Sequence, residues 1–322
     1  MVSALAAIAD PDLILRFFRM AAVKEDRGTE NRELAAAVAC AGAERMSTFL
    51  PHFILVNARK RPAGVLGLLA RLGREVGRSG KREWRELLAA VAVAVLKGLR
   101  LSFRPPLHGR KSPSRKSLDA TAGCNLFWLV NSFGTESQSA TAVALVARHP
   151  ARVAPERTVP QALVKMRERD GALVDAPAYE ALWRHAASAV LRRSECAPEG
   201  PVGWYIEAYL ACDCRGCVQL ARFCRDSASK RTKIAVNQGE RFHLRDKITT
   251  LGLDIDFETE RRGRPFKLVC TKNRNSHKRR LEEYADDLAT MKVLIDAVPT
   301  RDGRGLRAEE LDRLRGATSS TE

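Results

Sequence analysis

Long apolar segments are absent from this 322-residue sequence. The longest apolar run, residues 87–96, is far shorter than the roughly 20 residues that a membrane-spanning helix needs. Residues 1–10 lack the basic stretch that opens a secretory signal, and they lead into Asp10-Pro11-Asp12. We therefore expect a soluble, cytoplasmic protein that does not use a membrane.

Aromatic residues are also scarce, at 6% of the chain, whereas alanine and leucine are abundant. This balance favours helices over a β-sandwich. The hydrophobic content of 45% is enough for a folded core and excludes an intrinsically disordered chain. The length allows two domains of ordinary size.

Signatures of familiar active sites are missing as well. The sequence has no His-Glu-x-x-His, no Gly-x-Ser-x-Gly and no Gly-x-Gly-x-x-Gly. Residues 73–81 resemble a phosphate-binding loop only superficially, because Glu75 stands where glycine is needed and Arg82 replaces Ser or Thr. No small-molecule substrate is indicated, and catalysis is the less favoured class of function.

The first 199 residues carry apolar side chains at helical spacing and predict a helical domain. Residues 100–117 interrupt it with six Lys or Arg, three prolines and no acid, which indicates an exposed basic loop. The short connections favour a helical bundle or an irregular α-solenoid, a helical-repeat type without a repeat consensus at any fixed period. Helices are expected after Asp10 and over 33–49 (ending near Pro51), 62–77, 82–99, 124–133, 138–149 and 178–193.

Residues 200–299 differ in character and predict a small α/β module, followed by a polar tail over 300–322 with one helical turn over 308–314. Short helices are expected over 216–225 and 240–251. Apolar and polar residues then alternate on both sides of residues 260–265, which predicts a β-hairpin. A strongly amphipathic helix ends the module. The fold class is therefore mainly α, with a small α/β module and a β-hairpin near the C-terminus.

Three cysteines stand within six residues of this module, at Cys212, Cys214 and Cys217. Cytosolic thiols at such spacing are more often metal ligands than disulfides, and a pair two residues apart is the usual half of a zinc site. A structural site needs a fourth ligand, and His243 at the start of the next helix is the best candidate. Cys270 is a possible additional ligand, although its place in a strand also suits the core. Zinc is the expected cofactor.

Two other interpretations of the cysteines stay open. Cys214 and Cys217 form a Cys-x-x-Cys pair at a helix start, where the helix dipole stabilises a thiolate, as in redox proteins. The other interpretation is that the thiols are inert or bind no ion. Cys224 lies about two helical turns after Cys217, roughly 10 Å away, which is too far to share one ion easily.

The order of these residues resembles an uncharacterised region of bacterial and fungal proteins. The resemblance rests on Cys-x-Cys-x-x-Cys at residues 212–217, His243-Leu244, Thr-Glu-Arg-Arg-Gly-Arg-Pro at 259–265 and Leu-Val-Cys-Thr-Lys at 268–272. In that family the region accompanies a prolyl-hydroxylase-like 2-oxoglutarate/Fe(II) oxygenase domain or a long helical N-terminal part. It implies no established activity. The oxygenase is not implied here, because no histidine is followed two residues later by Asp or Glu.

Positive charge is concentrated in the same region. The net charge is +17, and residues 221–280 hold 17 Lys or Arg against 7 Asp or Glu, a net charge of +10. Such a surface attracts polyanions, although solvated arginines also explain it. Arg262-Gly263-Arg264-Pro265 matches an AT-hook core, but a hairpin turn that needs glycine explains it better. The arginines and lysines expected to contact an anion or nucleic acid are Arg261, Arg262, Arg264, Arg274, Lys278 and Arg279.

These features lead to one favoured function and two alternatives. The favoured one is a non-enzymatic interaction protein, whose helical domain and zinc-stabilised basic module bind a protein partner. The first alternative is a nucleic-acid-binding regulatory protein that uses the same basic surface. The second is a thiol redox protein that uses Cys214 and Cys217.

Overall fold

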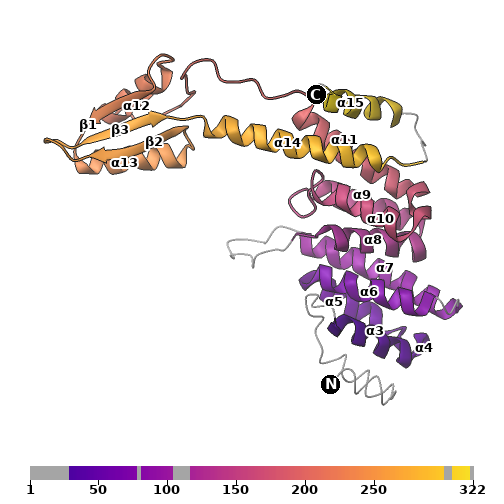
Figure 1. The fold of residues 1–322 in the computed structure, drawn as a ribbon. Coiled ribbons are helices and arrows are strands. Elements are labelled where there is room, and N and C mark those ends of the chain that lie inside the picture. Colours follow the sequence, from indigo (N-terminus) through magenta and orange to yellow (C-terminus); the bar gives the residue numbers. More distant parts are fainter. Residues whose placement is uncertain (1–28, 78–80, 104–116, 301–306, 320–322) are drawn as a thin grey trace. The chain divides into compact units, whose positions relative to one another are not determined.

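The chain forms two compact units in the computed structural model, which describes residues 29–77, 81–103, 117–300 and 307–319 (Figure 1). Unit 1 comprises Met1–Glu195 and Asp287–Glu322, and we call it the helical unit. Unit 2 comprises Cys196–Asp286, and we call it the module. The expected fold class, mainly α with a small α/β module, is confirmed. Within the described part of the chain, every helix is too short or too polar to cross a membrane.

Successive helices build the helical unit, and capping residues define where several of them start. The Asp119 carboxylate accepts the N–H of Ala122 at the start of α8, and Thr135 and Gln138 form a capping box at the start of α9. The elements are α3 (Thr29–Ala41), α4 (Ala43–Met46), α5 (Phe49–Lys60), α6 (Pro62–Gly77), α7 (Arg82–Phe103), α8 (Ala120–Phe133), α9 (Glu136–Arg148), α10 (Thr158–Arg169), the 3-10 turn η1 (Gly171–Asp175), α11 (Pro177–Ser194), the end of α14 (Asn275–Asp296) and α15 (Arg307–Ser319).

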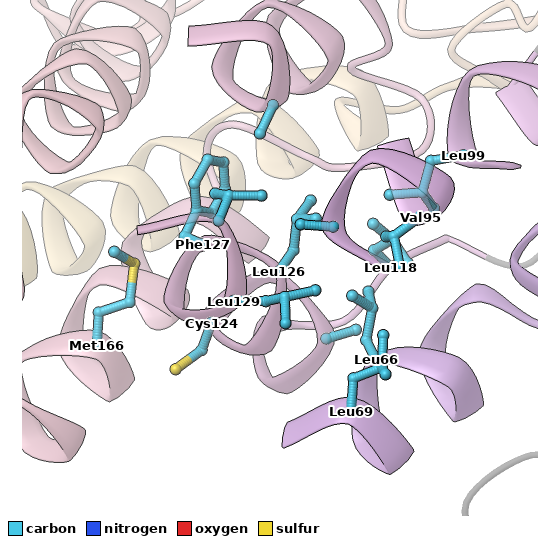
Figure 2. Close-up of a cluster of buried hydrophobic side chains, with 14 of the residues drawn as sticks. Leu66, Leu69, Val95, Leu99, Leu118, Cys124, Leu126, Phe127, Leu129 and Met166 are labelled. Carbon is cyan, nitrogen blue, oxygen red and sulfur yellow. The ribbon is translucent and has the colours of Figure 1, made fainter. Parts of the chain in front are cut away.

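One hydrophobic core runs through this unit. Helix α8 is buried along most of its length, so neighbouring helices cover it on several sides. Figure 2 shows part of this core, where side chains from α6, α7, α8 and α10 meet: Leu66, Leu69, Val95, Leu99, Leu126, Leu129 and Met166. Burial of apolar surface on this scale is the main source of stability for such a unit.

Several helix boundaries differ from the sequence-based expectation. Pro51 does not end a helix but lies in the first turn of α5, where its missing N–H would have had no partner. Residues 100–103 of the expected basic loop continue α7, and 104–116 lie outside the described residues. The helix expected after Asp10 also lies outside them. Helix α10 was not expected.

The C-terminal residues also depart from expectation. The second half of α14 belongs to the helical unit rather than to a 200–299 domain, because Met291 and Leu294 are fully buried in its core. The Trp183 indole N–H donates to the Leu294 carbonyl at 2.8 Å. Within the expected polar tail, residues 307–319 form α15, a helix longer than the single turn expected over 308–314. Leu314 and Ala317 on one face of α15 are buried in the same core.

Two polar contacts link α11 to the C-terminal helices of this unit. Asp287, 1% exposed, accepts from Arg193 Nε at 2.6 Å and from the Ser194 hydroxyl. At the end of α11, Arg313 donates two hydrogen bonds to Glu195, at 2.8 and 2.9 Å. These hydrogen bonds lower the pKa of Glu195 below its usual value.

The module contains a three-stranded antiparallel sheet in the order β1-β3-β2. The predicted hairpin is confirmed, with Gly263 at φ 78° in the turn, a conformation that favours glycine. The strand β1 was not expected, because it is short and only Ile234 is apolar and fully buried. The elements are α12 (Arg215–Arg225), β1 (Arg231–Ala235), α13 (Gln238–Thr250), β2 (Ile255–Glu260), β3 (Lys267–Lys272) and the start of α14.

The two faces of the sheet carry different side chains, since neighbouring residues of a strand point to opposite faces. One face packs against α12 and α13 through Ile234, Leu268 and Cys270. The opposite face carries cross-strand ion pairs, with Arg231 2.9 Å from Glu258 and Lys233 2.9 Å from Glu260. Glu258 and Glu260 of β2 are therefore paired with the basic residues of β1 on the face away from the helices.

A buried lysine joins the sheet to the end of α12. Lys272 is 1% exposed, and its ammonium donates to the carbonyls of Cys224 at 3.3 Å and Asp226 at 2.5 Å. It also lies 4.4 Å from the centre of the Phe223 ring. A cation at these carbonyls complements the negative end of the helix dipole. Burial lowers the pKa of Lys272.

Candidate metal centre

The module brings together Cys212, Cys214, Cys217 and His243, whose ligand atoms all lie within 4.8 Å of one another. Cys212 lies just before α12, Cys214 is the N-cap of α12, and Cys217 is in its first turn. His243 comes from α13. Three sulfur atoms and one imidazole nitrogen are close enough to bind one metal ion. These are the four residues that the spacing of the sequence indicated.

The start of α12 places the thiols. The Cys214 Sγ accepts the backbone N–H of Cys217 at 3.4 Å, as an N-cap side chain does. Gly216 is helical and makes room for α13. A Cβ at this position would lie 3.2 Å from a methyl group of Leu244. The glycine therefore allows close packing of α12 and α13.

Helix α13 brings the fourth ligand. Asn237 and Glu240 form a capping box that defines its start. The next residue after His243, Leu244, is fully buried against α12. As a result, the His243 Nε2 lies 3.3 Å from the Cys217 Sγ.

The pKa values of the Cys214 and Cys217 thiols are shifted in opposite directions. The Cys217 backbone N–H and the neighbouring thiols lower the pKa of Cys214. Burial and the neighbouring thiols raise the pKa of Cys217 to about 12. Cys214 thus ionises before Cys217, and a metal that binds here displaces the protons that the thiols still carry.

The two remaining cysteines of the module lie outside this group. Cys224 and Cys270 are fully buried in the module core. Burial raises the pKa of both, and that of Cys270 to about 12. Cys270, which we expected as a possible additional ligand, points into the core from β3. Neither residue is close enough to join the four ligand atoms.

The basic residues that the sequence singled out form two separate groups. Arg261, Arg262 and Arg264 are exposed in the β2–β3 turn. Lys278 and Arg279 are exposed near the start of α14, and Arg274 directly precedes that helix. The Arg274 guanidinium lies 4.8 Å from the centre of the Trp204 ring, and the Lys230 ammonium lies 4.9 Å from it. No pattern in the sequence pointed to this role of Trp204.

Sequence analysis also missed a group on α13. Arg241, Phe242 and Arg245 line an open groove beside the start of the hairpin turn. Phe242 is 57% exposed, which is unusual for a large aromatic side chain. The only available signal was a phenylalanine flanked by two arginines, next to the ligand His243.

Comparison with known proteins adds no assignment, because no family model matches the chain and neither curated proteins nor solved structures give a significant match. The resemblance of residues 212–272 to an uncharacterised bacterial and fungal region stays a prediction.

Proposed function

We propose that the chain is a non-enzymatic binding protein whose C-terminal module is stabilised by one structural zinc ion. The proposal rests mainly on one observation: the ligand atoms of four residues lie within 4.8 Å of one another, those of Cys212, Cys214, Cys217 and His243. The proposed location is the cytoplasm, where thiols stay reduced and available to a metal.

The donor set supports zinc. Three thiolates and one imidazole are a common tetrahedral zinc set, and soft sulfur ligands select against magnesium and calcium. Ligands about 2.3 Å from zinc in tetrahedral geometry are about 3.8 Å from one another. No two ligand atoms here are more than 4.8 Å apart, so no pair has to move closer by more than about 1 Å to bind zinc.

The composition of the site supports a structural role. Catalytic zinc sites keep one position open for water or substrate, whereas four protein ligands close the coordination sphere. The module core has only eleven buried side chains, so a metal ion that joins α12 to α13 adds stability where the core is small. The surrounding positive charge supports binding of a partner as the function of the module.

The thiol redox alternative rests on the lowered pKa of Cys214, which a redox pair requires. It needs only Cys214 and Cys217. It does not explain why Cys212 and His243 also lie beside Cys214 and Cys217, whereas a metal ion would be bound by all four residues.

Elemental analysis of the full chain, purified without chelator, tests the proposal. We expect one zinc per chain, strong loss of zinc in Cys212→Ser and His243→Ala, and unchanged zinc in Cys224→Ser. The last variant is a matched control, because Cys224 is a buried thiol of α12 outside the group. A folded, metal-free protein with a reversible disulfide between Cys214 and Cys217 would overturn the zinc proposal in favour of redox chemistry.

A further inference from the structure

An open groove of about 330 Å³ lies between α13 and the hairpin turn of the module. We call it the Phe242 groove. Arginine and phenylalanine dominate its lining, which contains no acidic residue. The residues that matter below are Arg241, Phe242, Arg245, Arg261 and Phe266.

The rings and guanidinium groups of this groove contact one another. The Arg245 guanidinium lies 5.0 Å from the centre of the Phe257 ring and 5.9 Å from that of Phe242. Arg241 lies 5.5 Å from the Phe266 ring and donates to the carbonyls of Phe266 at 3.2 Å and Val236 at 2.6 Å. Arg241 is therefore held in place, while the ring of Phe242 stays open to solvent.

Within the part of the chain that the structure describes, no acidic side chain pairs with the arginines of the groove. The carboxylates of Glu258 and Glu260 lie on the opposite face of the sheet, where they pair with the basic residues of β1. Among the described residues, Arg241, Arg245 and Arg261 form no ion pair. The groove thus combines an exposed aromatic face with three arginines that have no acidic partner among the described residues.

We propose that the Phe242 groove binds single-stranded nucleic acid, with a base stacked on Phe242 and phosphates contacted by Arg245 and Arg261. This inference rests on the proposed role of the module as a binding unit and names the class of its partner. Proteins that bind single strands present aromatic rings beside positively charged side chains, because every base offers a π-face and every nucleotide a phosphate.

The observations favour a single strand over two other polyanions. The faces of bases are hidden in a duplex, so duplex DNA leaves the Phe242 ring without a contact. An acidic peptide pairs with arginines but has no face to stack on the ring. Since stacking is tolerant of base identity and arginine–phosphate contacts carry no sequence information, binding is expected to be weakly sequence-dependent.

Fluorescence anisotropy with a labelled single strand of about 16 nucleotides, a length at the upper end of known site sizes, tests the proposal on full-length protein. We expect Phe242→Ala to weaken binding about 5- to 150-fold, the loss typical of one base–aromatic contact. Phe242→Trp keeps a π-face and is expected to keep the affinity. Val218→Ala, which truncates a 49% exposed apolar side chain on α12, is the matched control and should have no effect.

A second pair of variants tests the phosphate contacts. Arg245→Gln is expected to weaken binding and to reduce its salt dependence, because one phosphate contact fewer releases fewer counterions. Arg222→Gln removes the same charge from an exposed position on α12 outside the groove and is expected to change affinity much less.

Three results would overturn the inference: equal affinity for the single strand and its duplex, Phe242→Ala as tight as the parent protein, or polyglutamate that competes as well as an unlabelled single strand. Zinc is measured in each preparation. Normal zinc without strand binding refutes this inference alone, whereas strand binding by folded, zinc-free protein refutes the proposed zinc centre alone.

Discussion

Zinc should stabilise the module and leave the helical unit unchanged. A ligand that binds only the folded state adds about 1.4 kcal/mol to the unfolding free energy for each tenfold rise above its Kd, or about 4 kcal/mol at 1,000 Kd. The module spans Cys196–Asp286. For a domain of that size each kcal/mol shifts the Tm by about 4–8 °C, so the Tm of the module should rise by about 15–30 °C.

Hydrogen exchange read by mass spectrometry measures this effect separately in each unit. The full chain is loaded with zinc, or stripped with a chelator, and warmed in steps. Peptides from α12, α13 and β3 should lose protection at a much lower temperature without zinc. Peptides from α8 and α11 should behave alike in both samples, because they belong to the other hydrophobic core.

Two cysteines of α12 provide the control for this experiment. Cys217 and Cys224 are both fully buried, but only Cys217 belongs to the ligand group. Cys217→Ser should abolish the stabilisation by zinc. Cys224→Ser should lower the stability of the module and keep its response to zinc. An equal response of both variants, or a zinc effect spread evenly over both units, would refute the reasoning.

Three further predictions concern contacts outside the ligand group. Asp287→Ala should cost about 2–4 kcal/mol in urea unfolding of the helical unit, because it leaves the partly exposed Arg193 without its buried partner; a loss below about 0.5 kcal/mol, typical of surface sites, would contradict this. The lowered pKa of Glu195 means that its pairing with Arg313 stabilises the fold above the unfolded pKa, and that this contribution is lost as pH falls through the lower folded pKa. Urea midpoints between pH 6 and pH 3 should therefore fall less in Glu195→Gln than in the parent, and parallel curves would count against it. Lys272→Met should destabilise the module by about 1–3 kcal/mol, since two carbonyls lose a charged donor; an unchanged or raised exchange-derived stability would show that burying the ammonium costs more than its hydrogen bonds contribute.

Much of the helical architecture could be predicted because apolar periodicity and capping signals are local. Helix α6 begins and ends where the sequence indicated, at Pro62 and Gly77. Only one turn of α15 was expected, because its apolar stripe is narrow, and only packing in the helical core shows that Leu314 and Ala317 are buried. Strand β1 was missed because its alternation relies on Arg231 and Lys233, whose acidic partners come from β2.

The ligand group was predictable in composition but not in geometry. The spacing of Cys212, Cys214 and Cys217 is local, and His243 was the candidate at the start of the next helix. That Cys270 points into the core instead depends on the register of β3, which the sequence alone leaves open. The Phe242 groove needs α13 and the hairpin turn side by side, a tertiary relation without a sequence motif.

The order of the ligands along the chain has a consequence for biogenesis. Three of the four, Cys212, Cys214 and Cys217, lie within six residues, whereas His243 arrives only when α13 packs on α12. With zinc as the proposed metal, the three thiols of a newly made chain would bind the ion before the module folds, and the histidine would complete the site afterwards. A metal ion bound this early would favour the pairing of α12 with α13, and it would shield the thiols from oxidation while the core is still open.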